Sequence, residues 1–162
     1  MTISKIIKNH KAFSLIEILI VMTIVGILLS LGLPTMYNSL AEYKLNMAAR
    51  QVQADMHWAR EQAVKERNNF TIYFPTGLKQ YTVNRSGYDL QYRRELPAGV
   101  RIHATSFYYD KDRAYFSVDG RVINPTMGGT VMLENERGHL RYIILSRNGR
   151  VRISKEAPGA GE

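Results

Sequence analysis

The stretch that decides the fold runs from Phe13 to Leu33 and reads FSLIEILIVMTIVGILLSLGL, interrupted by a single charged residue, Glu17. As an α-helix, a segment of this length spans about 31 Å, which matches the hydrocarbon thickness of a bilayer. Residues 1–12 before it contain three lysines and no acidic residue, which favours an N-terminus held in the cytoplasm. The sequence therefore predicts a single-pass membrane helix over residues 13–33.

Glu17 is unusual within this segment. A carboxylate near the middle of a bilayer costs about 3 kcal/mol on insertion scales, and residues 13–36 contain no basic side chain to pair with it. The partner of Glu17 must therefore come from elsewhere. A free amine created by cleavage just before Phe13, on an adjacent subunit, would suit the carboxylate.

Lys11-Ala12 followed by the residues FSLIE, 13–17, resembles the processing site of type IV pilins and type II secretion pseudopilins. The resemblance implies that a prepilin peptidase cleaves between Ala12 and Phe13 and removes residues 1–12 as a basic leader. It also implies that Phe13 is N-methylated and that Glu17 aligns subunits in a helical filament. One departure is Ala12, because the family usually has glycine before the cleaved bond.

Gly26 and Pro34 strengthen the resemblance, because pilins carry a glycine and a proline at similar places. Both residue types are more frequent in membrane helices than in soluble ones, and a proline also removes a helical hydrogen bond. The resemblance implies that the segment between Gly26 and Pro34 loosens during filament assembly.

Beyond Pro34 the helical pattern continues. Apolar residues recur at steps of three or four up to Ala63, and no Gly or Pro interrupts residues 35–67. Asn68-Asn69 is the expected stop. The pattern predicts an amphipathic helix over residues 34–68, whose apolar stripe needs a sheet to cover it.

From residue 69 to 156 the hydrophobic period changes to two, which indicates strands. Asp119-Gly120 and Asn148-Gly149 are tight-turn signals, and residues 157–162 are expected to form a tail. The predicted fold class is α+β, with one long N-terminal helix packed on an antiparallel β-sheet domain. Strands are expected at residues 70–74, 79–84, 90–96, 100–104, 114–118, 122–123, 130–134, 139–146 and 151–154.

The C-terminal third carries a second, narrower pattern. Residues 115–121 read YFSVDGR, residues 128–133 read GGTVML, residues 142–146 read YIILS and residues 148–152 read NGRVR. This order resembles the GspH/FimT family of minor pilins and pseudopilins. That family has an F-x-x-D-G-R turn, then a glycine before a strand, and then a terminal hairpin ending in G-R-x-R.

The composition argues against catalysis. The chain has no cysteine, which excludes thiolate zinc sites, disulfides and a cysteine nucleophile. The sequence contains none of the metalloprotease, hydrolase, Walker or dinucleotide-binding motifs. Asp110 and Asp112 lack the ligand series of a calcium loop. We therefore expect no enzyme activity, cofactor, metal or small-molecule substrate.

Arg147, Arg150 and Arg152 lie close together in the terminal hairpin of a chain whose formal charge is +8. Arginine can bind phosphate with paired hydrogen bonds. Some FimT-like minor pilins take part in DNA uptake, and the resemblance implies a DNA contact at these arginines. The alternative is a solvated basic edge strand, which discourages aggregation between sheet edges.

The sequence thus predicts a non-enzymatic minor pseudopilin of a type II protein secretion system. The alternative is a FimT-type minor pilin of a type IV pilus that binds DNA for natural transformation. The expected partners are other pilin or pseudopilin subunits, the prepilin peptidase and the membrane. The expected location is the bacterial inner membrane, with the C-terminal domain periplasmic, and then a filament.

The first prediction concerns processing at the Ala12-Phe13 junction. Mass spectrometry of the assembled protein is expected to find N-methylated Phe13 as the first residue, with residues 1–12 absent. Functional filaments built from a chain with an intact leader would contradict the prediction.

Overall fold

The computed structural model describes residues 14–86, 89–107, 110–122 and 128–159, without the side chains of residues 31–35. The chain divides into two compact units, Met1–Asn38 and Ser39–Glu162, and each is described by itself. Ala12 and Phe13 lie outside the described residues, as do Ile123, expected in a strand, and the end of the tail.

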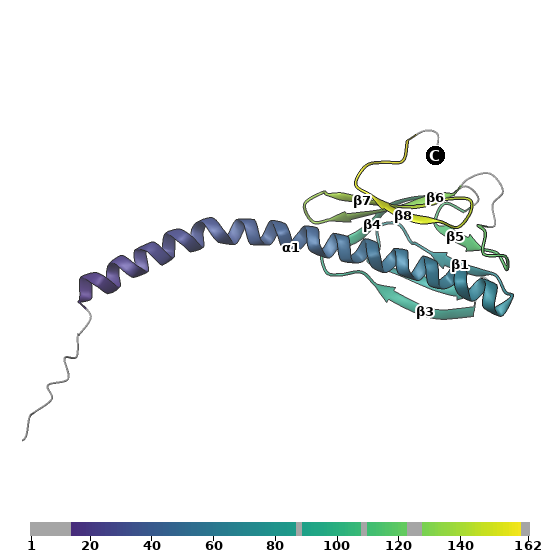
Figure 1. The fold of residues 1–162 in the computed structure, drawn as a ribbon, viewed down its shortest axis with the longest axis horizontal. Coiled ribbons are helices and arrows are strands. Elements are labelled where there is room, and N and C mark those ends of the chain that lie inside the picture. The colour runs from purple at the N-terminus through teal and green to yellow at the C-terminus, as the bar shows by residue number, and fades with distance from the viewer. Residues whose placement is uncertain (1–13, 87–88, 108–109, 123–127, 160–162) are drawn as a thin grey trace, which may run out of the picture. The chain divides into compact units, whose positions relative to one another are not determined.

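Helix α1 extends over Leu15–Glu66 (Figure 1). The first unit contains its apolar half, where every large apolar side chain between Leu15 and Leu29 is at least 43% exposed. Among the described residues, no helix is both long and apolar enough to cross a membrane.

The end of α1 has a specific local cause. Arg67 has a φ of 49°, and the backbone N–H of Asn68 donates to the carbonyl of Ala63 at 3.2 Å. A left-handed residue followed by this backward hydrogen bond is the Schellman arrangement that closes helix C-termini. The helix therefore ends at Glu66, two residues before the end expected from the sequence.

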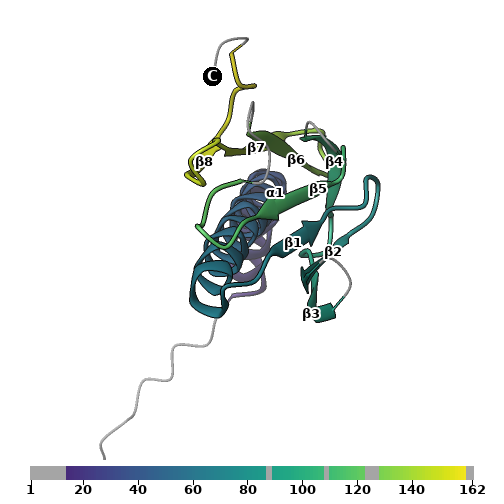
Figure 2. The same cartoon turned by 90° about the vertical axis from the view of Figure 1, so that its right-hand side faces the viewer.

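Two four-stranded antiparallel sheets follow α1, in the orders β3-β2-β1-β5 and β4-β6-β7-β8. Figure 2 shows the two sheets beside α1 in the second unit. The predicted α+β class and the antiparallel pairing are confirmed. The strands are β1 (Phe70–Tyr73), β2 (Gln80–Arg85), β3 (Asp89–Glu95), β4 (Val100–Phe107), β5 (Arg113–Phe116), β6 (Gly129–Asn135), β7 (Leu140–Leu145) and β8 (Val151–Ser154).

Of the strand expected at residues 122–123, the structure describes only Val122, which makes an isolated bridge with Phe116. The N–H of Val122 donates to the carbonyl of Arg147 at 3.4 Å. β4 is longer than expected, because it continues to Phe107, three residues beyond the expected end.

The core lies in the second unit. The first buried residue along the described chain is Leu45, so the second unit has a complete hydrophobic core of its own. Tyr37 fits the helical stripe in the sequence but is 63% exposed, because it precedes this core. The buried positions of α1 recur at helical spacing and are Leu45, Ala48, Ala49, Val52, Asp55, Met56, Ala59 and Ala63.

A buried carboxylate joins α1 to the first sheet. Asp55, which is 5% exposed, accepts hydrogen bonds from the hydroxyls of Tyr81 at 2.6 Å and Tyr92 at 3.2 Å. The guanidinium of Arg94 donates to it at 3.2 Å and balances its charge. Burial, together with the neighbouring Asp55 carboxylate, raises the pKa of both tyrosines well above the ordinary value.

A buried arginine joins α1 to the second sheet. Arg141 on β7 is 5% exposed and donates to Glu42 at 2.7 Å, to Asn46 at 2.8 Å and to the carbonyl of Leu140 at 2.8 Å. These bonds provide the partners that a buried guanidinium requires. Arg141 thus joins Glu42 and Asn46 of α1 to β7.

Two glutamines on α1 reach edge strands. The side chain of Gln51 donates to the carbonyl of Glu95 at the end of β3 at 3.2 Å, and that of Gln53 donates to Val151 on β8 at 3.0 Å. Both strands are outermost in their sheets. The helix thus satisfies backbone groups at one edge of each sheet.

The second prediction concerns Tyr81→Phe, which keeps the ring but removes the hydroxyl that donates to Asp55. We expect the free energy of unfolding at neutral pH to fall by about 1–2 kcal/mol, because a buried acceptor loses a donor. Chemical denaturation of residues 35–162 measures the change. The exposed tyrosine in Tyr43→Phe is the control, with an expected effect below about 0.5 kcal/mol.

The pH dependence gives a second measurement on the same variant. The raised pKa of Tyr81 keeps its phenol neutral in the folded state. Its contribution is therefore complete below the unfolded pKa of about 10, and it is lost as the pH rises from there towards the folded pKa. The alkaline decline in stability should be shallower in Tyr81→Phe, and identical pH slopes would refute this.

Candidate functional site

Two tight turns carry the motifs of the C-terminal third. In the first, the N–H of Gly120 donates to Ser117 O at 2.8 Å, and in the second, the N–H of Gly149 donates to Ser146 O at 2.9 Å. Both glycines have positive φ, 74° and 76°, which glycine adopts without a steric cost. The two turns predicted from Asp-Gly and Asn-Gly are confirmed.

Both turns contact the side chain of Arg60 on α1. Arg60 Nε donates to the carbonyl of Gly120 at 2.9 Å. A Cβ on Gly149 would lie 2.7 Å from that same carbonyl oxygen and 2.9 Å from Arg60 Nε. We call residues 117–121 and 146–150 the turn pair, because they pack against each other and against Arg60. No spacing pattern in the sequence pointed to Arg60, since its two contacts come from turns far along the chain.

The predicted arginines differ in environment. Arg147 and Arg150, in the turn pair, are exposed, and Arg152 on β8 is half-buried. Within the described part of the chain, no ion pair includes Arg147 or Arg150. Arg150 is thus more open to solvent than Arg152, which lies opposite Ile144 of β7.

The first turn carries its own charges. Asp119 and Arg121 form a long, exposed ion pair at 3.8 Å, with the Arg121 side chain 76% exposed. A hydrogen bond from Ser117 and one from the backbone N–H of Arg121 lower the pKa of Asp119. Asp119 is therefore held as a carboxylate within the turn, and Arg121 extends into solvent.

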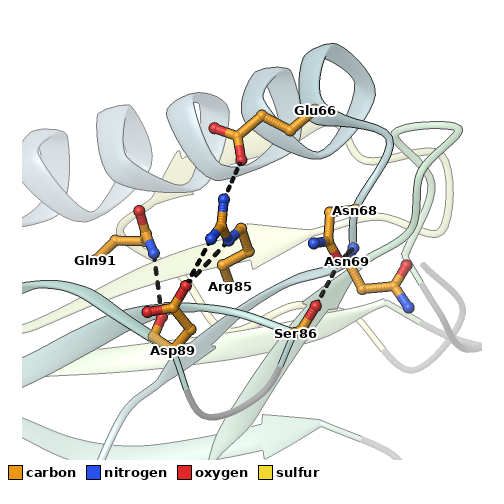
Figure 3. Close-up of polar contacts among 7 residues, drawn as sticks. All are labelled: Glu66, Asn68, Asn69, Arg85, Ser86, Asp89 and Gln91. Atoms are coloured by element: carbon orange, nitrogen blue, oxygen red, sulfur yellow. Dashed lines mark hydrogen bonds and ion pairs between the residues drawn. The ribbon is translucent and has the colours of Figure 1, made fainter.

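A polar cluster lies at the C-terminal end of α1 (Figure 3). Arg85 on β2 bridges Glu66 at 3.2 Å and Asp89 at 2.9 Å, and these two carboxylates raise its pKa. Ser86 has a φ of 47° and donates to the side chain of Asn68. These contacts join the end of β2 and the start of β3 to the end of α1, so we interpret the cluster as structural.

The residues predicted for assembly lie in the other unit. Glu17 is exposed in the first turn of α1, where the helix dipole favours a carboxylate. A Cβ on Gly26 would meet no atom within 4 Å, and Pro34 lies inside α1. The structure thus places Glu17 and the arginines in separate units.

Among the described residues, no three or more His, Asp or Glu side chains gather in a way that could hold a metal ion. Asp112, singled out in the sequence, accepts hydrogen bonds from Thr76 at 3.1 Å and Thr105 at 2.6 Å. These bonds give it a structural role in joining neighbouring segments.

Comparison with known families assigns both parts of the chain. Residues 7–33 match the prokaryotic N-terminal methylation motif. Residues 48–149 match the family of the type II transport protein GspH, and this match covers more than half of the chain. The chain therefore belongs to the GspH family, and the predicted resemblance is confirmed.

Solved structures show the same fold. The type IV minor pilin FimU of Pseudomonas aeruginosa has a TM-score of 0.59 at 19% identity, covering 72% of this chain and 94% of that one. The minor pseudopilin EpsH of the Vibrio cholerae type 2 secretion system has a TM-score of 0.55 at 11% identity, covering 68% and 96%. No curated protein matches the sequence. The fold is thus that of type IV pilin-like proteins.

The third prediction tests the packing of the turn pair with Gly149→Ala and Gly77→Ala. Both glycines have a similar positive φ, 76° and 81°, but a Cβ on Gly77 would meet nothing within 4 Å. Gly77→Ala should cost about 1 kcal/mol from backbone strain alone. Gly149→Ala should cost about 1–3 kcal/mol more, because its Cβ overpacks the site.

Chemical denaturation of residues 35–162 gives both free energies of unfolding. Since the two substitutions share the same backbone penalty, their difference isolates the contact with Gly120 and Arg60. Equal costs would show that the second turn does not pack on the first.

Proposed function

We propose that the chain is a non-enzymatic minor pseudopilin of a type II secretion system, a filament subunit that supports protein export. One observation carries the proposal: a GspH domain at residues 48–149 follows an N-terminal methylation motif at residues 7–33. The methylation motif supports processing of the N-terminus before assembly, and the family description favours secretion.

The exposed surface of the first unit supports assembly with other subunits. Its large apolar side chains between Leu15 and Leu29 are 43–81% exposed, and a surface of this kind indicates contact with lipid or protein. We propose that residues 13–33 anchor the chain in the inner membrane, with the N-terminus cytoplasmic and the β-rich domain periplasmic. During assembly the same surface packs against other pseudopilin subunits.

Glu17 fits a role in setting the register of subunits. Residues 13–36 offer no basic side chain as a partner, and a carboxylate in an apolar contact is costly unless it is paired. Prepilin peptidase cleavage after Ala12 creates an amine at Phe13, and we propose that this amine on a neighbouring subunit pairs with Glu17. Gly26 and Pro34 then bound the part of α1 that loosens.

The alternative is a minor pilin of a type IV pilus that binds DNA. The likeness to FimU supports its fold, and the exposed Arg147 and Arg150 favour binding to an anionic partner. A DNA contact at Arg147, Arg150 and Arg152 stays a prediction.

The fourth prediction concerns Glu17→Ala in the full-length chain. Membrane fractionation should show insertion at least equal to wild type, because a charge has been removed from an apolar segment. Incorporation into filaments, measured by immunoblot of sheared filaments, should fall at least about tenfold, since the loss of a paired buried charge costs several kcal/mol.

Glu61→Ala is the matched control, because Glu61 is an exposed glutamate on the same helix but lies in the second unit. It should enter the membrane and filaments as wild type does. Equal incorporation of Glu17→Ala and Glu61→Ala would rule out the register role.

A further inference from the structure

We propose that the turn pair, together with Val64 of α1, forms a docking surface for an acidic surface of a partner protein. The proposal concerns the second unit. It does not rest on the contacts of residues 13–33 in a filament, so the assembly proposal and the docking proposal can fail separately.

Two exposed valines lie where the turn pair meets α1. Val64 is 50% exposed and Val118 is 46% exposed. Val64 lies against the first turn, since a Cβ on Gly120 would be 2.9 Å from its Cγ2. Val118 occupies that same turn, two residues before Gly120. The surface therefore has an apolar part that stays about half exposed in the described chain.

Three arginines belong to the same turn pair. Arg121, Arg147 and Arg150 are all exposed, and the N–H of Val122 donates to Arg147 O at 3.4 Å, which holds the two turns side by side. The turn pair contains one carboxylate, Asp119, against these three arginines. The surplus of positive charge is complementary to an acidic partner.

The surface is already organised before binding. Each turn is closed by its own backbone hydrogen bonds, and Arg60 packs against Gly120 and Gly149 at once. A rigid surface loses little conformational entropy on association, so more of the contact free energy appears as affinity. The same packing explains why glycine stands at both turns.

The composition favours a protein over DNA as the partner. Protein interfaces combine an apolar centre with a polar, charged rim, and here Val64 and Val118 lie beside the arginines. Nucleic-acid surfaces are much more positively charged, whereas the turn pair contains Asp119 beside its arginines. Neither turn contains an aromatic residue on which a base could stack.

The experiment places a photo-crosslinking amino acid at Val118 of the full-length chain in its native cells. The matched control position is Ser106, which is exposed on β4. Mass spectrometry of the adduct should identify an acidic protein segment joined at Val118, with no such adduct from Ser106. An adduct removed by nuclease would establish DNA instead, and equal adducts from both positions, or none, would overturn the proposal.

Charge reversal tests the role of the arginines. Arg121→Glu with Arg150→Glu should reduce the Val118 adduct at least about tenfold, because like charges would then face each other. Reversal of the mapped carboxylates on the partner to lysine should restore it. The control variant Lys79→Glu with Lys111→Glu makes the same change in net charge at exposed positions outside the turn pair.

Thermal unfolding of both double variants checks that the domain is intact, which is expected because all four side chains are exposed. An adduct that persists after reversal of the turn-pair arginines, or that is lost equally in the lysine control, would overturn the proposal. Filament incorporation of the same variants is scored separately, so a failure of assembly is distinguished from a failure of docking.

Discussion

The second unit depends on one constraint: a single helical stripe must be covered by two sheets. The buried positions of α1 include Ala48, Ala49, Ala59 and Ala63, and these short side chains let β-strands approach the helix closely. Large side chains from both sheets then fill the remaining space, among them Phe70, Tyr81 and Leu133. If the stripe were discontinuous, neither sheet would have a surface on which to pack, since each consists of only four strands.

Polar contacts then set the position of each sheet on that stripe. Hydrophobic packing alone is non-directional, whereas Asp55 accepts from two tyrosines of the first sheet and Arg141 of the second sheet donates to Glu42 and Asn46. A shift of either sheet along α1 would leave a buried charge without its partner. The helix therefore determines both where the sheets pack and in which register.

Much of the fold follows from local patterns in the sequence. The helical period, the change to a period of two and the glycines at positions 120 and 149 predicted α1, most strands and both tight turns, because each depends on neighbours a few residues away. The division into two sheets and the network around Asp55 depend on residues brought together from distant parts of the chain. Arg60 was missed for the same reason, and the half-buried state of Arg152 depends on its pairing opposite Ile144 in β7.

The late start of the core along α1 also has an evolutionary consequence. No described side chain before Leu45 is buried, so the core of the β-rich domain places no packing demand on those described positions. Selection on that part of the helix can act through its intermolecular contacts alone, while selection from Leu45 onward must also preserve the fold. One continuous helix thus contains two segments free to diverge at different rates, and such a chain can acquire new assembly partners without losing its domain.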